Sequence, residues 1–128
     1  MILNPYDLYN RLLDIKHGRI KEGLKIDIPE IDEYLRYKQG NFNLLIGHAN
    51  VGKTTVMLYL FVTWAVKHGL KFLIWSSENT PQAIQRKIIE FKMQQTITLA
   101  KDEEIKEALA WSTLFFKIID VEELYTYK

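Results

Sequence analysis

Apolar residues follow two different periods along the chain, and the alternation of these periods predicts a mixed α/β domain. Short, mainly apolar runs are typical of strands buried in a parallel sheet, and they occur at residues 42–46, 71–77 and 114–119. Longer segments with helical spacing of apolar residues separate these runs, at residues 54–68, about 79–97 and about 102–113. The order β-α-β-α-α-β predicts a doubly wound α/β fold, in which a mostly parallel sheet is flanked by helices.

Two more helices are predicted before the first strand. Asn4-Pro5 is a helix-start signal, and the apolar residues after it form a stripe along an amphipathic helix that ends near Gly18. Two positions are open for this helix: against its own domain, or against a neighbouring subunit. Pro29 begins a shorter predicted helix over residues 29–37. We therefore divide the chain into an N-terminal helix and linker, residues 1–24, and an α/β domain, residues 25–128.

Local signals define where the central helices begin and end. Gly69 is a predicted C-cap, and Asn79-Thr80 before Pro81 is a predicted N-cap. Residues 56–66 are apolar apart from Thr63, a run of about eleven residues, whereas a helix needs about 20 to cross a bilayer. The run predicts a helix buried on nearly all sides within a soluble domain.

Composition limits the number of domains and excludes cysteine chemistry, but it does not identify a partner. The chain has 128 residues, 48% of them hydrophobic, which suffices for one domain with a core. Its 17 basic and 16 acidic residues give a net charge of +1, so bulk charge neither favours nor excludes a nucleic-acid partner. The absence of cysteine excludes disulfides, cysteine-based zinc sites and thiol catalysis. The N-terminus lacks the pattern of a signal peptide, so we expect a cytoplasmic protein without a membrane partner.

One sequence motif predicts a phosphate-binding loop. The segment from Gly47 to Thr54, Gly-His-Ala-Asn-Val-Gly-Lys-Thr, matches the P-loop pattern G-x-x-x-x-G-K-[ST]. In this pattern backbone N–H groups surround phosphate oxygens, the lysine reaches the terminal phosphates, and the hydroxyl binds magnesium. We expect Thr55 to approach the α-phosphate and His48 to point to solvent. The predicted nucleotide-binding residues are Gly47, Asn50, Val51, Gly52, Lys53, Thr54 and Thr55, with Thr54 also binding Mg²⁺.

The surroundings of the motif agree with it. A predicted strand precedes the loop and a predicted helix follows it, which places a helix N-terminus beside the phosphates. Glu78 stands at the end of the second predicted strand. Because ligands of parallel sheets lie outside the carboxyl ends of the strands, we expect Glu78 at the same edge as the P-loop.

Together the P-loop and Glu78 resemble the RecA-like ATPases, and within them the DnaB-type replicative helicases. The lead-in Ile-Pro-Glu-Ile-Asp-Glu-Tyr-Leu at residues 28–35 and the phrase Trp-Ser-Ser-Glu-Asn at residues 75–79 look like that family, as does Arg86 with a spacing that differs by one. The resemblance covers about residues 25–120. It implies ATP and Mg²⁺ as ligands, with Lys53 and Glu78 as catalytic residues and Glu78 orienting the attacking water. It also implies single-stranded DNA as a partner, a homo-oligomer that is a hexameric ring in the full-length protein, and the cytoplasm of a bacterial or phage-infected cell.

The chain departs from the family where the Walker B aspartate and the arginine finger are expected. Aligned with the family, the strand before Asp120 is an earlier strand and the Walker B strand lies beyond Lys128; alternatively, Asp120 is the Walker B residue itself. On the first alignment the sheet lacks a central strand. We then expect a partial ATPase domain, which is either the N-terminal portion of a longer helicase-like protein or a truncated relative that closes its sheet differently or by swapping. As an isolated chain it is expected to be oligomeric or rearranged.

Three functions fit these observations to different degrees. The first is an ATP-hydrolysing motor domain of a DnaB-like helicase. The second is a RecA-like regulatory or assembly module in which ATP holds an interface together and hydrolysis is slow or absent. A small-molecule kinase fits less well, because no arginine-rich lid segment is visible.

Overall fold

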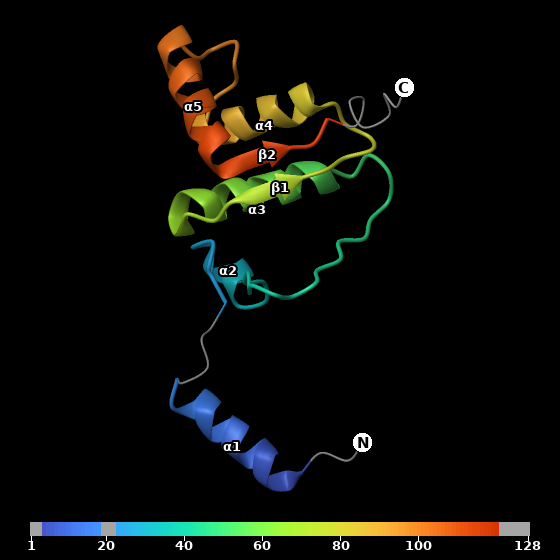
Figure 1. Cartoon of the computed structure of the whole chain (residues 1–128), viewed down its shortest axis with the longest axis vertical. Helices are drawn as coiled ribbons and strands as arrows, with labels where there is room; N and C mark the ends of the chain where they lie inside the picture. Colours follow the sequence, from blue (N-terminus) through green and yellow to red (C-terminus); the bar gives the residue numbers. More distant parts are fainter. Residues whose placement is uncertain (1–3, 19–22, 121–128) are drawn as a thin grey trace, which may run out of the picture. The chain divides into compact units, whose positions relative to one another are not determined.

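A computed structural model describes residues 4–18 and 23–120 of the chain (Figure 1). The chain divides into two compact units, Met1–Asn41 and Phe42–Lys128, which we describe separately. The division after residue 24 that the sequence suggests stays a prediction. In chain order the elements are α1 (Pro5–Lys16), α2 (Pro29–Asp32), α3 (Lys53–His68), β1 (Phe72–Ile74), α4 (Pro81–Met93), α5 (Asp102–Phe115) and β2 (Phe116–Ile118).

In the first unit, α1 is the amphipathic helix that the sequence predicts. The side chain of Asn4 accepts a hydrogen bond of 3.0 Å from the Tyr6 N–H, and Pro5 occupies the first turn, where its missing N–H costs nothing. No residue of α1 is buried. Its apolar stripe is exposed and consists of Tyr6, Leu8, Tyr9, Leu12 and Ile15. Packing of this stripe against its own domain or against a neighbouring subunit stays a prediction.

The second helix is shorter than predicted: it ends at Asp32 and does not reach Tyr37. The carboxylate of Asp32 is buried and accepts a hydrogen bond of 2.7 Å from the Ile26 N–H. Tyr37, predicted as the last helical residue, instead forms an isolated antiparallel bridge with Leu24. Turn hydrogen bonds continue beyond Asp32 to the Leu35 N–H, and the chain is extended at Tyr37, so that residue cannot also be helical.

In the second unit, β1 and β2 form a two-stranded parallel sheet with Phe72 opposite Phe116. The N–H of Ile119 extends the pairing by donating to the Ile74 carbonyl oxygen at 2.9 Å. The α4 and α5 helices provide the crossover that a parallel pair requires (Figure 1). Both strands are shorter than the predicted runs of residues 71–77 and 114–119. The unit is therefore a mixture of helices and a short parallel sheet, compatible with an incomplete α/β fold.

The core of this unit lies where two helices meet the sheet. Its buried residues come from α3, α4 and β2, and they are Leu58, Val62, Ala65, Ile84, Ile88 and Phe116. Aromatic rings extend the core across the strands: the Phe72 ring lies between those of Phe61 and Phe116, at centroid distances of 4.6 and 5.5 Å. Stacked rings of this kind add to the free energy of burial.

The α3 helix is predicted well in its length and less well in its burial. Gly69 closes it in the left-handed conformation, with φ of 67° and its N–H bonded to the Ala65 carbonyl oxygen, as expected of a C-cap. The expectation of burial on nearly all sides is wrong, because Val56, Tyr59 and Val66 are 44 to 52% exposed. Among the described residues no helix is long and apolar enough to cross a membrane.

The predicted first strand, residues 42–46, is not a strand in the structure. The segment has no partner strand among the described residues, and Figure 1 shows it as part of an irregular trace that leads into α3. Phe42 and Ile46 are 90% and 82% exposed. A parallel strand depends on pairing with distant residues, and within residues 4–18 and 23–120 the sheet contains only β1 and β2. The apolar run is therefore left at the surface.

Candidate functional site

The P-loop, residues 47–54, forms a tight loop that leads directly into α3. Asn50 and Gly52 both adopt the left-handed conformation, with φ of 61° and 90°, and Gly52 is the N-cap of the helix. No side chain caps this N-terminus, whereas Asn4 and Thr80 accept hydrogen bonds at the starts of α1 and α4. The first N–H groups of α3 are thus left for an acceptor outside the helix, as an anion site requires.

The Lys53 side chain connects the two ends of the P-loop. Its ammonium group donates a hydrogen bond of 2.5 Å to the carbonyl oxygen of Gly47, at the other end of the motif. A Cβ atom on residue 47 would lie 3.2 Å from both the Lys53 Cδ and the Val51 Cγ2 atoms, closer than ordinary van der Waals contact. The lysine stem therefore passes over Gly47 because no side chain stands there.

Lys53 and Thr54 line a cavity of about 310 Å³. Its other walls come from α3, α4 and the carboxyl end of β1, and they include Met57, Phe61, Ile74, Trp75 and Ser76. No group of three or more histidine, aspartate or glutamate side chains in the described ranges could hold a metal ion. Magnesium in nucleotide sites is held mainly by phosphates and water with one or two protein oxygens, so the Thr54 hydroxyl beside Lys53 fits that ion.

Glu78 lies in the turn after β1, where Ser76 shapes the backbone. The Ser76 hydroxyl accepts hydrogen bonds from the N–H groups of Glu78, at 3.3 Å, and Asn79, at 3.1 Å. Glu78 shares a cavity of about 290 Å³ with Asp120, which follows β2. The two carboxylates thus lie at the carboxyl edge of the sheet. Ser76 lines both this cavity and the cavity that contains Lys53. Glu78 and Lys53 therefore lie in two adjoining cavities.

The remaining predicted residues lie either on the exposed surface of the P-loop or in the first turn of α3. His48, Asn50 and Val51 are exposed, and for His48 this was expected. Thr55 is the third residue of α3, and its hydroxyl accepts a hydrogen bond of 3.0 Å from the ammonium group of Lys87.

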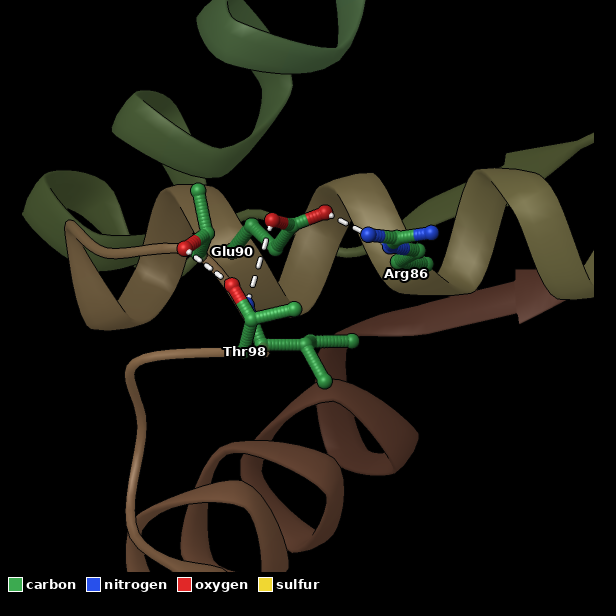
Figure 2. A network of polar contacts seen from close by, with 5 residues as sticks. Arg86, Glu90 and Thr98 are labelled. Carbon is green, nitrogen blue, oxygen red and sulfur yellow. Dashed lines mark hydrogen bonds and ion pairs between the residues drawn. The ribbon is translucent and has the colours of Figure 1, made fainter.

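The basic residue that reaches the P-loop helix is Lys87, not Arg86. Arg86 forms an ion pair with Glu90 on its own helix, with 3.0 Å between Nε and Oε1, as Figure 2 shows. Adjacent positions of an α-helix differ by about 100° in direction, so only one of the two can face α3. The spacing difference noted in the sequence was the available signal for Lys87, but choosing between the two residues requires the packing of α4 on α3.

Comparison with models of protein families, with characterised proteins and with solved structures finds no match to this chain. Functional inference therefore rests on the residues and the geometry described above.

Proposed function

We propose that this chain binds Mg-ATP at the P-loop and hydrolyses it, as part of the motor domain of a DnaB-type replicative DNA helicase. The observation that carries the proposal is the loop itself: Lys53 is folded back over Gly47, beside a helix N-terminus that no side chain caps. A phosphate group can replace the Gly47 carbonyl as the acceptor for Lys53 and can accept the N–H groups of the first turn.

The roles of the other residues follow from the chemistry of phosphoryl transfer. This reaction depends mainly on positioning and on electrostatic stabilisation of charge. In the proposal Lys53 holds the β- and γ-phosphates and Thr54 contributes an oxygen to Mg²⁺. Glu78 orients the attacking water, and its position at the carboxyl end of β1 supports this role. Asp120 remains a candidate for the magnesium-associated acid, because it lines the same cavity as Glu78.

The helicase assignment is the part of the proposal that rests on resemblance. It draws on the P-loop, the lead-in at residues 28–35 and the phrase at residues 75–79. With it come single-stranded DNA as the track, a hexameric ring in the full-length protein and a place in the cytoplasm of a bacterial or phage-infected cell. ATP turnover that rises when a single-stranded oligonucleotide is added would support this assignment, and turnover that is indifferent to DNA would count against it.

The alternative is a RecA-like module that binds ATP and hydrolyses it slowly or not at all. One observation favours it: Glu78 lies in a cavity next to that of Lys53, so the two groups do not face one common space. In this case ATP would stabilise an assembly, and the catalytic carboxylate would be out of position.

Two substitutions separate these functions. Lys53→Ala should abolish ATP binding in calorimetric titration, because it removes the cation that faces the terminal phosphates. Glu78→Gln should leave binding intact and stop phosphate release if Glu78 orients the water. Lys106→Ala and Glu107→Gln are matched controls at exposed positions of α5. Unchanged hydrolysis in Glu78→Gln would rule out its catalytic role, and a wild-type chain that binds ATP without turnover would favour the regulatory module.

A further inference from the structure

A third cavity begins at the residue after the P-loop and runs between α3 and α4. Its volume is about 570 Å³, within the range of about 300–1,000 Å³ typical of small-molecule pockets. The residues that line it are Thr55, Tyr59, Lys87, Glu90, Phe91, Gln94, Gln95 and Thr96. None of these residues except Thr55 has a role in the phosphate chemistry described above.

The end of this cavity next to the P-loop carries a positive charge. There the Lys87 ammonium group lies 3.0 Å from the Thr55 hydroxyl, so a cation stands beside the first turn of α3. Glu90 also lines the cavity, but its carboxylate is already paired with the Arg86 guanidinium. Figure 2 shows Glu90 between Arg86 and the loop that carries Thr98; one carboxylate oxygen pairs with Arg86 and the other accepts a hydrogen bond of 3.3 Å from the Ile97 N–H.

The cavity also has an aromatic wall, one helical turn away from this cation. The Tyr59 ring meets the Phe91 ring edge to face, with centroids 5.6 Å apart and planes at 78°. Tyr59 is 44% exposed, so part of its ring is open to a ligand. Thr55 and Tyr59 are four residues apart and therefore share a face of α3, separated by about 5.4 Å along its axis.

The rim beyond the aromatic wall is polar. Gln94 ends α4 in the left-handed conformation, with φ of 58°, and its amide is exposed there. An amide offers both donor and acceptor groups, which the edge of a heterocyclic base also does. The neighbouring Gln95 amide donates a hydrogen bond to Glu104, and the Ile97 N–H is bonded to Glu90, so the loop that forms this rim is tied to α4 and α5.

We propose that this cavity receives the nucleoside half of the nucleotide whose phosphates lie on the P-loop. The base stacks on the Tyr59 ring, Lys87 faces the α-phosphate, and Gln94 contacts the edge of the base. The order of groups along the cavity, from cation to aromatic ring to amide, matches the order of phosphate, base and base edge in a nucleotide. This inference rests on the proposed function, since it requires phosphates at Lys53.

The test compares two probes, Mg-ATP and inorganic tripolyphosphate with magnesium, in calorimetric titrations of the full chain. Tyr59→Ala should weaken ATP binding about tenfold or more, because stacking on an aromatic ring is lost, and should leave tripolyphosphate binding unchanged. Tyr59→Phe keeps the ring and should bind ATP as the wild type does. Tyr34→Ala is the control, since it removes an exposed tyrosine from the other unit.

The outcomes separate this inference from the proposed function. If the wild type binds neither probe, the proposed function fails. If it binds both and Tyr59→Ala changes neither affinity, nucleotide binding stands and the nucleoside pocket is wrong. Loss of binding to a short single-stranded oligonucleotide in Tyr59→Ala, with ATP affinity intact, would also overturn it and assign the ring to nucleic acid.

A second measurement does not depend on the folding of a variant. Irradiating the wild-type chain with 8-azido-ATP should label a peptide that contains Tyr59 or one that contains Phe91 to Gln94, because the azide is carried on the base. Labelling confined to other peptides would contradict the proposed position of the base.

Discussion

The ammonium group of Lys53 donates a hydrogen bond to the carbonyl oxygen of Gly47, which lies six residues earlier at the opposite end of the loop. The lysine thus joins the two ends of the loop, and it is also the first residue of α3. Gly52, which turns the chain between these two residues, has φ of 90° and is open on the side where a Cβ atom would stand. The constraint at Gly52 is therefore one of backbone conformation and not of space.

Gly52→Ala is expected to destabilise the loop by roughly 1–2 kcal/mol, the cost of a left-handed conformation for a residue with a Cβ atom. ATP affinity should fall, because relief of that strain would rotate the N–H groups at the start of α3 away from the phosphates. The control is Gly40→Ala, a position with similar φ of 85° in the other unit. It should lower the free energy of unfolding in urea without changing the affinity for ATP. Equal losses of affinity in both variants would show that the effect is not local to the loop.

Lys87 contacts the P-loop helix where the sequence suggested Arg86, and this difference gives a second prediction. Lys87→Met should weaken ATP binding several-fold, because it removes the cation beside Thr55 while keeping the length of the side chain. Arg86→Met should leave ATP binding unchanged and cost only about 0.3–0.5 kcal/mol of stability, the usual contribution of an i,i+4 ion pair at a surface. Titration calorimetry and urea unfolding of both variants measure the two effects. The reverse result would mean that the family-like position of Arg86 describes the site better than the contacts do.

These two residues also show how far the sequence alone can predict the site. The P-loop, the Thr80 N-cap and the Gly69 C-cap are recognisable because each depends on residues within a few positions of itself. The choice between Arg86 and Lys87 depends on which side of α4 packs on α3, and that is decided by the whole core. A position one residue along a helix points about 100° away, so a small uncertainty in alignment changes which residue is functional.

The same distinction between local and distant interactions explains the errors in the fold. Helices α3, α4 and α5 were expected close to their observed positions, because apolar periodicity and caps are local. The predicted strand at residues 42–46 was wrong, because an apolar run becomes a strand only when another strand pairs with it. The second helix does not reach Tyr37 because that residue pairs with Leu24 in an antiparallel bridge, a contact that apolar periodicity cannot reveal.

Glu104 gives a prediction about pH. Hydrogen bonds from the Lys101 N–H and the Gln95 amide lower the pKa of this carboxyl below its ordinary value of 4.5. A group whose pKa is lower in the folded state stabilises the protein above its unfolded pKa, and this stabilisation is lost as the pH falls through the folded pKa. Glu104→Gln should therefore be less stable than the wild type at pH 6, and the difference should shrink as the pH falls below about 4.5.

Urea unfolding of the two proteins at a series of pH values checks this prediction. Glu103→Gln is a suitable control, since Glu103 lies beside Glu104 in the first turn of α5. A difference between wild type and Glu104→Gln that is constant across this pH range would mean that the carboxylate charge is not what stabilises the start of α5.

The last prediction concerns the exposed segment before the P-loop. Among the described residues the sheet has only two strands, so β1 and β2 each have one edge without a partner strand, and residues 42–46 have no partner strand at all. Unpaired extended segments with exposed apolar side chains associate with one another. We therefore expect the isolated 128-residue chain to self-associate in sedimentation velocity experiments, with an apparent mass that rises with concentration.

The double variant Leu44→Lys with Ile46→Lys should weaken association, because both side chains are at least 71% exposed and charge opposes stacking of such segments. Leu99→Lys, at a position 77% exposed in the loop before α5, should leave association unchanged. A chain that is monomeric at all concentrations and unfolds in one cooperative transition would contradict this prediction. It would show that neither residues 42–46 nor the sheet edges bind a second copy of the chain.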